Sequence, residues 1–362
     1  MPKRIAIVHD WLTGMRGGEQ CLKNILSITG KTDIYTLIYN PEPIDEDIKK
    51  NNIYTSFLQY FPGIVLYYRY MLPLFPFAIS GFNFSGYDLV ISISHCVAKS
   101  IKKDVNTRHI SYCLTPMRYA YDMYDVYFRK GSFKRIFTDL FITRIREWDI
   151  KRASFVDEFV AISEFVRERI SRIYNRDSRV IYPPARTDFF VFNEKIKTEN
   201  YYITVSAIEP YKGIGILLEA FKKDASRRLL IVGKGSMLSY YKRLAPENVA
   251  FTDWVNDFKL RDYLRSAKGF IFPAVDDFGI TPVEAMACGV PVIAINRGGA
   301  KETVLDGKTG LFFDFENSVE SLLDIITKFE RITWDKKEVR AHSLNFSQEI
   351  FKTKMEKVIK GD

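Results

Sequence analysis

Short apolar runs alternate with longer segments of helical periodicity along almost the entire chain. Short runs flanked by turn residues predict buried strands, and apolar residues spaced three and four apart predict amphipathic helices. In the first half, the pattern predicts strands at 4–10, 33–38, 87–94, 109–114 and 158–163, and helices at 19–28 and 164–174. Such alternation is typical of βαβ units, in which helices cover both faces of a parallel sheet.

The alternation is interrupted at 180–200, which contains Pro183-Pro184, and then restarts. Strands are predicted at 201–207, 227–233, 248–253, 269–274 and 290–295, with helices at 213–223, 259–267 and 281–289. We therefore expect an α/β fold of two Rossmann-like, doubly wound domains, 1–184 and 185–346, hinged at the proline pair. A final helix at about 347–362 is free to pack back onto the first domain. Ligands of such sheets bind at the carboxyl ends of strands, so the expected site is the interdomain cleft.

A length of 362 residues suits two such domains, and 47% hydrophobic residues give each a core. The four cysteines, Cys21, Cys96, Cys113 and Cys288, have no CxxC or Cys/His spacing. This favours buried, reduced thiols over zinc ligands or disulfides. The N-terminal stretch indicates a first strand, with no secretion signal.

The net charge of +9 suggests nucleic acid, an anionic membrane or a phosphorylated substrate as partner. No zinc finger, RNP motif or basic heptad region is present, which argues against nucleic acid. The apolar segment 57–82 is broken by Arg69 and by three prolines, which argues against a membrane-spanning helix. Its mixture of aromatic, leucine and arginine residues suits a helix in a lipid interface, but equally a helical hairpin packed within its own domain.

The stretch 272–304, "FPAVDDFGITPVEAMACGVPVIAINRGGAKETV", predicts a strand end, a loop and a helix. Thr281 is expected as the N-cap and Glu284 at N3, which together form a capping box. The amides of Gly279, Ile280 and Thr281 would favour an anion at the helix N-terminus. Capping leaves Asp276 unexplained, and carboxylates beside an anion site suit a ligand with phosphates and hydroxyls, such as a nucleotide sugar.

The segment "DDFGITPVEAMACGVPVIAINRGGAKETVLDGKTGLFF" resembles the C-terminal signature of the retaining glycosyltransferases of family 4, which have the GT-B fold. The segments "IAIVHDWLTGMRGGEQ", "YCLTPMRYAYDMY" and "IEPYKGIGILLEAF" extend the resemblance to nearly the whole chain. The chain is most similar to the branch of bacterial mannosyltransferases that make O-antigen and capsule.

The resemblance implies a role for each matching residue. Glu284 matches the glutamate that binds the ribose hydroxyls, and Asp276 replaces the glutamate that contacts the transferred sugar. The amides of Phe278, Gly279, Ile280 and Thr281 match those that hold the sugar and the diphosphate. Lys212 matches the lysine that neutralises the leaving diphosphate, so Asp276, Lys212 and Glu284 are the expected catalytic residues.

Two departures from the family pattern affect this assignment. Ala207 stands where the family usually has an arginine that assists Lys212, and we hypothesise that Arg297 supplies part of that charge. Leu114 replaces a histidine that is frequent in this branch. Together with Asp276, these departures leave open a non-catalytic protein that binds a nucleotide sugar or supports a partner enzyme.

In the N-terminal half, Gly17 and Gly18 are expected between the first strand and the first helix, facing the diphosphate. His9 and Asp10 end the first strand and are candidates for the acceptor side. Arg118 and Asp122 are further acceptor-side candidates, with a mutual i,i+4 salt bridge as the alternative. His95 ends a later strand, where a buried structural role is favoured.

The function that the resemblance implies is retaining transfer of a hexose, without a metal or other cofactor. Mannose from GDP-mannose is the favoured donor, and a UDP-sugar or a GDP-deoxyhexose is the alternative. The resemblance implies that the acceptor is a lipid-linked glycan, on polyprenyl diphosphate, or a growing surface glycan such as lipopolysaccharide. A basic set suits docking at the inner face of the cytoplasmic membrane, and its alternative is a solvated helix face: Arg69, Arg129, Lys130, Lys134, Arg135, Arg144 and Arg146.

Overall fold

The computed structural model describes residues 4–127 and 133–362. The chain divides into two compact units: unit 1 is Met1–Pro184 with Phe351–Asp362, and unit 2 is Ala185–Ile350. The division follows the Pro183-Pro184 pair. Of the basic set, Arg129 and Lys130 lie outside the described residues, and only the backbone of Lys134 and Arg135 is described.

Within the described residues, unit 1 contains a seven-stranded parallel sheet in the order β3-β2-β1-β4-β5-β6-β7. Most side chains of β1 and β4 are apolar and nearly all are buried, as expected for strands covered on both faces. The strands are β1 (Ile5–His9), β2 (Asp33–Thr36), β3 (Asn52–Thr55), β4 (Leu89–Ser94), β5 (Arg108–Cys113), β6 (Glu158–Ala161) and β7 (Arg179–Val180).

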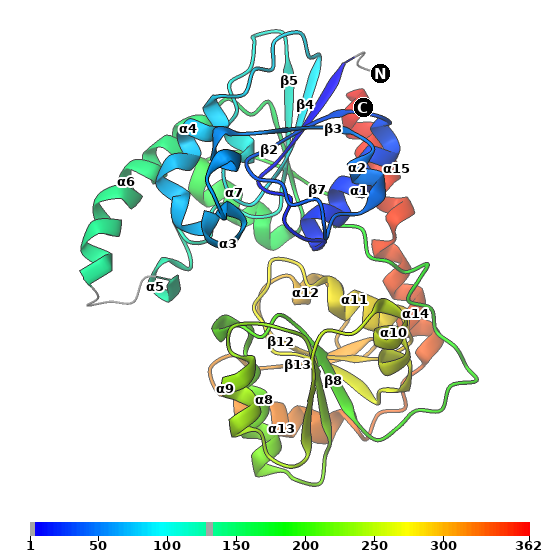
Figure 1. The fold of residues 1–362 in the computed structure, drawn as a ribbon. Helices are drawn as coiled ribbons and strands as arrows, with labels where there is room; N and C mark the ends of the chain where they lie inside the picture. Colours follow the sequence, from blue (N-terminus) through cyan, green and yellow to red (C-terminus); the bar gives the residue numbers. More distant parts are fainter. Residues whose placement is uncertain (1–3, 128–132) are drawn as a thin grey trace. The chain divides into compact units, whose positions relative to one another are not determined.

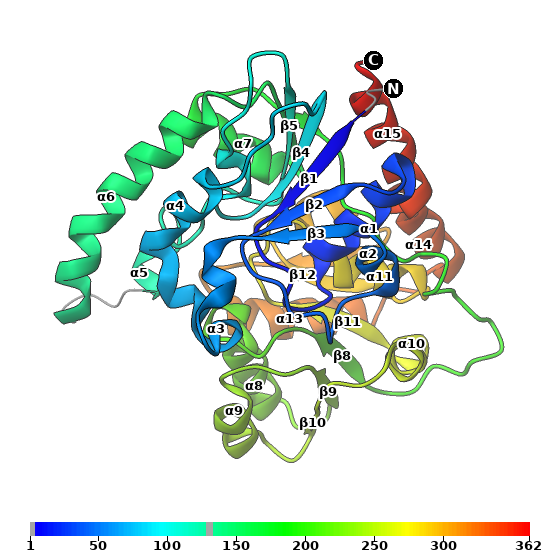
Figure 2. The same ribbon diagram turned by 45° about the horizontal axis from the view of Figure 1, so that its top comes forward.

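Helices lie on both faces of the unit 1 sheet (Figures 1 and 2). The α-helices of this unit are α1 (Gly17–Thr29), α2 (Glu46–Lys49), α3 (Ile64–Tyr67), α4 (Phe75–Ser80), α5 (Tyr124–Tyr127), α6 (Phe133–Ala153), α7 (Glu164–Tyr174) and α15 (Gln348–Lys360). Three short 3-10 helices join them: η1 (Phe57–Tyr60), η2 (Tyr68–Leu74) and η3 (Ala98–Ser100).

The C-terminal helix α15 packs beside α1 on one face of this sheet (Figures 1 and 2). Arg108 at the start of β5 donates to Val358 O at 3.0 Å. The rings of Tyr112 and Phe351 pack edge to face, with their centres 5.5 Å apart. These contacts assign the end of the chain to unit 1, although the preceding elements belong to unit 2.

The apolar segment 57–82 folds into four short helices, η1, α3, η2 and α4, instead of one long hairpin. Pro73 lies inside η2, where proline removes a helical hydrogen bond, and Pro76 lies in the first turn of α4, where proline is tolerated because the first N–H groups have no acceptor within the helix. Among the residues that the structure describes, no helix has the length and apolar character needed to cross a membrane.

Unit 2 contains a six-stranded parallel sheet, within the described residues, in the order β10-β9-β8-β11-β12-β13. Its strands are β8 (Tyr202–Val205), β9 (Leu229–Val232), β10 (Val249–Thr252), β11 (Gly269–Phe272), β12 (Val292–Ile295) and β13 (Gly310–Phe313). Its helices are η4 (Pro210–Lys212), α8 (Ile214–Lys223), α9 (Leu238–Leu244), α10 (Asp257–Ser266), α11 (Ile280–Ala287), α12 (Ala300–Thr303), α13 (Ser318–Phe329), α14 (Lys336–Ser343) and η5 (Leu344–Phe346). Helices α8, α9 and α13 cover one face, and α10, α11 and α14 the other (Figure 1).

All ten predicted strands form, and three further strands of the sheets were missed. Strand β3 is exposed at alternate residues, β7 has two residues, and β13 follows a glycine-containing turn, so none shows a long apolar run. All four cysteines are buried and free, which agrees with the sequence-based interpretation.

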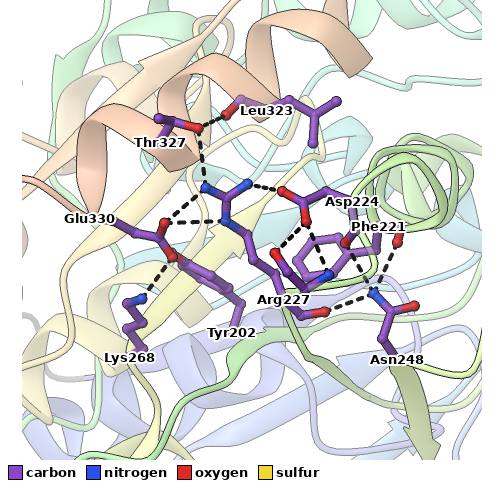
Figure 3. Close-up of polar contacts among 10 residues, drawn as sticks. Tyr202, Phe221, Asp224, Arg227, Asn248, Lys268, Leu323, Thr327 and Glu330 are labelled. Carbon is purple, nitrogen blue, oxygen red and sulfur yellow. Dashed lines mark hydrogen bonds and ion pairs between the residues drawn. The ribbon is translucent and has the colours of Figure 1, made fainter.

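A polar network lies at the amino-terminal ends of the strands in the unit 2 sheet (Figure 3). Glu330 accepts from Arg227 Nη2 at 2.8 Å, from Lys268 Nζ at 2.7 Å and from Tyr202 OH at 3.0 Å. Burial alone would raise the pKa of Glu330, but the bonds from these three side chains lower it to about 2. The network joins the starts of β8, β9 and β11 to the end of α13. The candidate site lies at the opposite, carboxyl ends of the strands.

We expect Glu330→Gln to lower the free energy of unfolding by about 2 kcal/mol near neutral pH, because three donors lose a charged acceptor. The pKa of the Glu330 carboxyl lies below its ordinary value of 4.5. Its contribution to the free energy of unfolding is therefore present above pH 4.5 and is lost as the pH falls toward 2. Urea unfolding should therefore show the wild-type advantage shrinking from about pH 5 to about pH 3. Glu247→Gln, at an exposed position of the same unit, is the control and should change little.

Candidate functional site

The strand order of unit 2 reverses between β8 and β11, which pair although β9 and β10 separate them in the sequence. Doubly wound sheets bind ligands at the carboxyl ends of the strands beside such a switch point. Lys212 follows β8 and Asp276 follows β11. The Lys212 Nζ atom lies 2.7 Å from Oδ1 and 2.6 Å from Oδ2 of Asp276, and the two side chains are 16% and 20% exposed. The structure thus brings two of the predicted residues together as an ion pair that a ligand can reach.

Glycines hold the loop between β11 and α11 against its neighbours. Gly213, directly after Lys212, has a φ of +71°, and a Cβ there would come within 2.7 Å of the carbonyl oxygen of Pro273. Gly299 donates its N–H to Asp276 O at 2.9 Å, and a Cβ on it would lie 2.4 Å from Cα of Phe278. Larger residues at either glycine would displace the loop that carries Asp276.

Helix α11 begins earlier than predicted. Its N-cap is Gly279, with a φ of +90°, and the helix runs from Ile280 without a side-chain cap. Thr281 is therefore the second helical residue, and the predicted capping box with Glu284 is wrong. The physical reason is that Gly279 adopts a left-handed conformation and turns the chain into the helix before Thr281.

The N-terminus of α11 retains the geometry that suits an anion. The first N–H groups of a helix, here those of Ile280 and Thr281, have no acceptor within the helix. Phe278 is buried, so it contributes its backbone and anchors the loop. A negatively charged group beside these amides would be favoured by the helix dipole.

The carboxylate of Glu284 is buried and paired with a residue that the sequence analysis missed. Arg186 donates through Nε to Glu284 Oε1 at 3.0 Å and through Nη1 to Asp257 Oδ2 at 2.5 Å. Burial raises the pKa of Glu284 to about 7, against the opposing effect of Arg186. Neither Arg186 nor Asp257 belongs to a recognisable spacing pattern, because they lie 98 and 27 positions from Glu284 in the sequence.

Ala207 after β8 and Arg297 after β12, which was expected to supply the charge missing at Ala207, are both exposed. Ala207 lies two residues after the end of β8, and Glu209 beyond it accepts from Ser236 N at 3.1 Å. The guanidinium of Arg297 lies 4.8 Å above the ring of Phe315, in a pocket that Asp314 also lines. The proposed contribution of Arg297 to diphosphate binding stays a prediction.

In unit 1, the two candidates at the end of β1 have structural contacts. Asp10 is fully buried and accepts the backbone N–H groups of residues 95–98 at 2.7 to 2.9 Å. His95 Nδ1 lies 3.1 Å from the same carboxylate. His9 donates through Nδ1 to Trp11 O at 3.0 Å, and its buried Nε2 has no partner among the described residues. Asp10 therefore anchors the turn after β4, while His9 retains an unused ring nitrogen.

Helix α1 starts at Gly17, so Gly17 and Gly18 are its first residues and do not lie between strand and helix as predicted. A Cβ on Gly18 would meet His9 Nε2 at 3.2 Å and Leu114 Cδ1 at 3.0 Å. Gly18 thus allows α1 to approach β1 and the end of β5. This packing accounts for Gly18, and its role toward a diphosphate stays a prediction.

The acceptor-side candidates Arg118 and Asp122 lie in turns between β5 and α5, outside any helix. Asp122 pairs with two arginines of α7, with Arg172 Nη2 2.6 Å from Oδ1 and Arg169 Nε also in contact. Arg169 in turn donates to Thr115 Oγ1 at 2.8 Å. Asp122 therefore links the turn after β5 to α7.

Residues 185–342 match the model of the family described as glycosyl transferases group 1. A GDP-mannose-dependent alpha-(1-6)-phosphatidylinositol monomannoside mannosyltransferase of Mycolicibacterium smegmatis is 37% identical over 187 residues, 44% of this chain and 49% of that protein. The O-antigen chain mannosyltransferase RfbU of Salmonella typhimurium is 27% identical over 198 residues, 50% of this chain and 55% of that protein. The chain spans about half the length of the curated relatives it matches.

Two solved structures resemble the chain over nearly all of both lengths. HepE of Anabaena in complex with UDP has a TM-score of 0.72 at 16% identity, covering 99% of this chain and 100% of its own. The lipopolysaccharide outer core galactosyltransferase WaaB has a TM-score of 0.68 at 15% identity, with 99% of both chains covered. The chain therefore has the two-domain α/β architecture of the GT-B fold, which confirms the predicted fold class.

We expect Asp10→Asn to destabilise unit 1 by about 3 kcal/mol, because the amide nitrogen would face backbone donors that now share a buried carboxylate. Chemical denaturation monitored by tryptophan fluorescence measures the change. Asp104→Asn, at an exposed position of the same unit, is the control. Equal stability of the two variants would show that the four backbone contacts of Asp10 contribute little.

Proposed function

We propose that this chain is a retaining glycosyltransferase that moves mannose from GDP-mannose to a lipid-linked or growing surface glycan. The observation that carries the proposal is the Lys212–Asp276 pair at the switch point of unit 2, inside the segment that matches glycosyl transferases group 1. The mannosyltransferase names of two relatives support mannose as the sugar, and the first of these names also specifies GDP-mannose.

Each residue of the site has a role in this reaction. The ammonium group of Lys212 stabilises the diphosphate as the bond between the anomeric carbon and the phosphate oxygen breaks. The departing phosphate oxygen takes the proton of the acceptor hydroxyl, which attacks from the same face, so the configuration is retained. Asp276 orients the sugar and Glu284 binds the ribose hydroxyls, and we propose that no metal ion is needed.

A different donor is the second candidate. The HepE structures were solved with UDP and with UDP-glucose, so the same fold accommodates a uridine nucleotide in another protein. A GDP-deoxyhexose would also fit a site with a shortened acidic residue at position 276. The non-catalytic alternative rests on Ala207 and Leu114, which remove side chains that related enzymes use.

Thermal unfolding with matched concentrations of GDP, UDP, ADP and their sugar conjugates distinguishes these candidates. A ligand at about a hundred times its Kd stabilises the protein by about 2.7 kcal/mol, which gives a measurable shift. We expect GDP and GDP-mannose to raise the midpoint. A shift with UDP ligands alone would indicate a UDP-sugar as the donor. No shift with any nucleotide would contradict the proposal that the chain uses a nucleotide sugar.

The ion pair makes a specific prediction for GDP affinity. Lys212→Gln removes the cation and should weaken GDP binding about 10- to 100-fold. Asp276→Asn removes the carboxylate that competes for Lys212, so GDP should bind equally well or a few-fold tighter while mannose transfer falls. Calorimetric titration measures the affinities, and Lys222→Gln, exposed on α8, is the control. Weaker GDP binding by Asp276→Asn would contradict the competition.

We also propose that unit 1 docks on the cytoplasmic face of an anionic membrane, where a polyprenyl-diphosphate-linked acceptor would be available. The segment 57–82 exposes an apolar surface of four side chains: Tyr60 (84%), Leu66 (89%), Tyr70 (83%) and Phe77 (69%). Arg69 lies between two of them in sequence, and apolar side chains interleaved with a cation suit a lipid interface.

Sedimentation with anionic vesicles tests this docking. We expect the protein to bind vesicles at low salt, and Leu66→Ser with Tyr70→Ser to reduce binding several-fold. Val105→Ser, which removes an equally exposed apolar side chain elsewhere in unit 1, is the control. Absence of wild-type binding at low salt would rule out peripheral attachment and leave the nucleotide-sugar proposal intact.

A further inference from the structure

The guanidinium group of Arg186 lies between two carboxylates of unit 2. Its Nε donates to Glu284 Oε1 at 3.0 Å, its Nη1 to Asp257 Oδ2 at 2.5 Å, and its Nη2 to Asp257 Oδ1 at 3.4 Å. The planar fork of an arginine fits two such acceptors at fixed angles, which a lysine ammonium cannot reproduce. Arg186 thus fixes the direction of the Glu284 carboxylate.

Three separate segments build this cluster. Arg186 comes from the chain before β8, Asp257 begins α10, and Glu284 lies in the second turn of α11. The side chain of Arg186 also packs over Phe190, with its guanidinium carbon 4.9 Å from the ring centre. The position of the guanidinium is therefore set by packing as well as by charge.

The environment of Glu284 requires a compensating charge. Its side chain is 6% exposed, and a buried carboxylate without a cation becomes neutral. Burial raises its pKa to about 7, Arg186 opposes the rise, and Asp257 adds to it. Among the described residues, Arg186 is bonded to Oε1, and no side chain donates to Oε2.

Other charged groups pack near this part of α11 without bonding to the Glu284 carboxylate. Arg340 of α14, the helix packed on α11, donates to Ala287 O at 2.8 Å, and His342 bonds to Thr303 O at 2.9 Å. On α10, Arg265 donates to Val191 O at 2.6 Å, and Arg261 stacks over Phe189. These partners leave Arg186 and Asp257 as the groups that act on Glu284.

We propose that Arg186 is a positioning residue for nucleotide binding: it favours the ionised form of Glu284 and directs Oε2 toward the vicinal hydroxyls of a ribose, while Asp257 holds the guanidinium. The inference rests on the proposed function of this site, since it assumes that a nucleoside diphosphate binds there. An ionised carboxylate accepts hydrogen bonds from two hydroxyls, whereas a neutral one presents a proton to them.

The test compares GDP with 2′,3′-dideoxy-GDP, which lacks both hydroxyls, by calorimetric titration. Wild-type protein should prefer GDP about 10- to 100-fold, as expected for hydrogen bonds to a charged group. Arg186→Gln should bind the two ligands with nearly equal, weak affinity, and Arg186→Lys should recover only part of the preference. Arg228→Gln, at an exposed position of unit 2, should retain the full preference.

The pH dependence separates this role from a merely structural one. The preference for GDP should decline in the wild type as the pH falls through about 7, because Glu284 becomes protonated. Arg186→Gln should raise the pH at which half of this preference is lost, which is the midpoint of the decline. Asp257→Asn should move it to lower pH, because it removes the charge that opposes ionisation, and it remains informative if Arg186→Gln does not fold.

The outcomes distinguish failure of the proposed role of Arg186 from failure of the proposed function. Wild-type protein that binds GDP without preferring it to the dideoxy analogue overturns the inference and leaves the proposed function in place. The same holds if Arg186→Gln keeps the wild-type preference and midpoint. Failure of wild-type protein to bind any nucleotide overturns both.

Discussion

The ion pair between Lys212 and Asp276 is the interaction on which the account of unit 2 depends. It joins the chain after β8 to the chain after β11, the two strands between which the strand order reverses. Glycines set this geometry, because Gly213, Gly298 and Gly299 allow three loops to approach within distances that a Cβ would prevent. The polar network around Glu330 ties the opposite edge of the sheet together (Figure 3). The amino-terminal ends of the strands are thus fixed by satisfied structural contacts, and the carboxyl ends carry the partly exposed Lys212–Asp276 pair.

A comparison of buried charges separates structural from functional groups. In unit 1, Lys99 and Asp149 are 1% and 0% exposed, and Asp149 also accepts from Tyr121 and Tyr174. Asp10 is equally buried and satisfied by backbone donors. Such groups cannot take up a ligand without leaving another buried group unpaired, which is costly. Lys212 and Asp276 are partly exposed and bonded to each other, so under the proposed function a diphosphate and a sugar hydroxyl would replace that bond.

Much of the fold could be predicted from the sequence, because apolar runs in parallel strands are determined locally. Lys212 and Asp276 were both expected at the donor site because of the resemblance, whereas their direct contact is visible only in the folded chain. The capping box failed because local propensity favoured Thr281, whereas the left-handed turn at Gly279 starts α11 earlier. Arg186 was missed for a different reason: its partners are 98 and 71 positions away, and only the folded chain brings them together. Gly18 and Asp10 were predicted to face ligands, yet the structure gives both clear packing roles.

The most direct test of the central claim is a crystal structure of the protein with GDP-mannose bound. The account predicts that the diphosphate lies within hydrogen-bonding distance of Lys212 Nζ and of the first amides of α11, with the Lys212–Asp276 bond opened and Asp276 bonded to a sugar hydroxyl. A nucleotide bound elsewhere in the chain, with the Lys212–Asp276 pair intact, would contradict it.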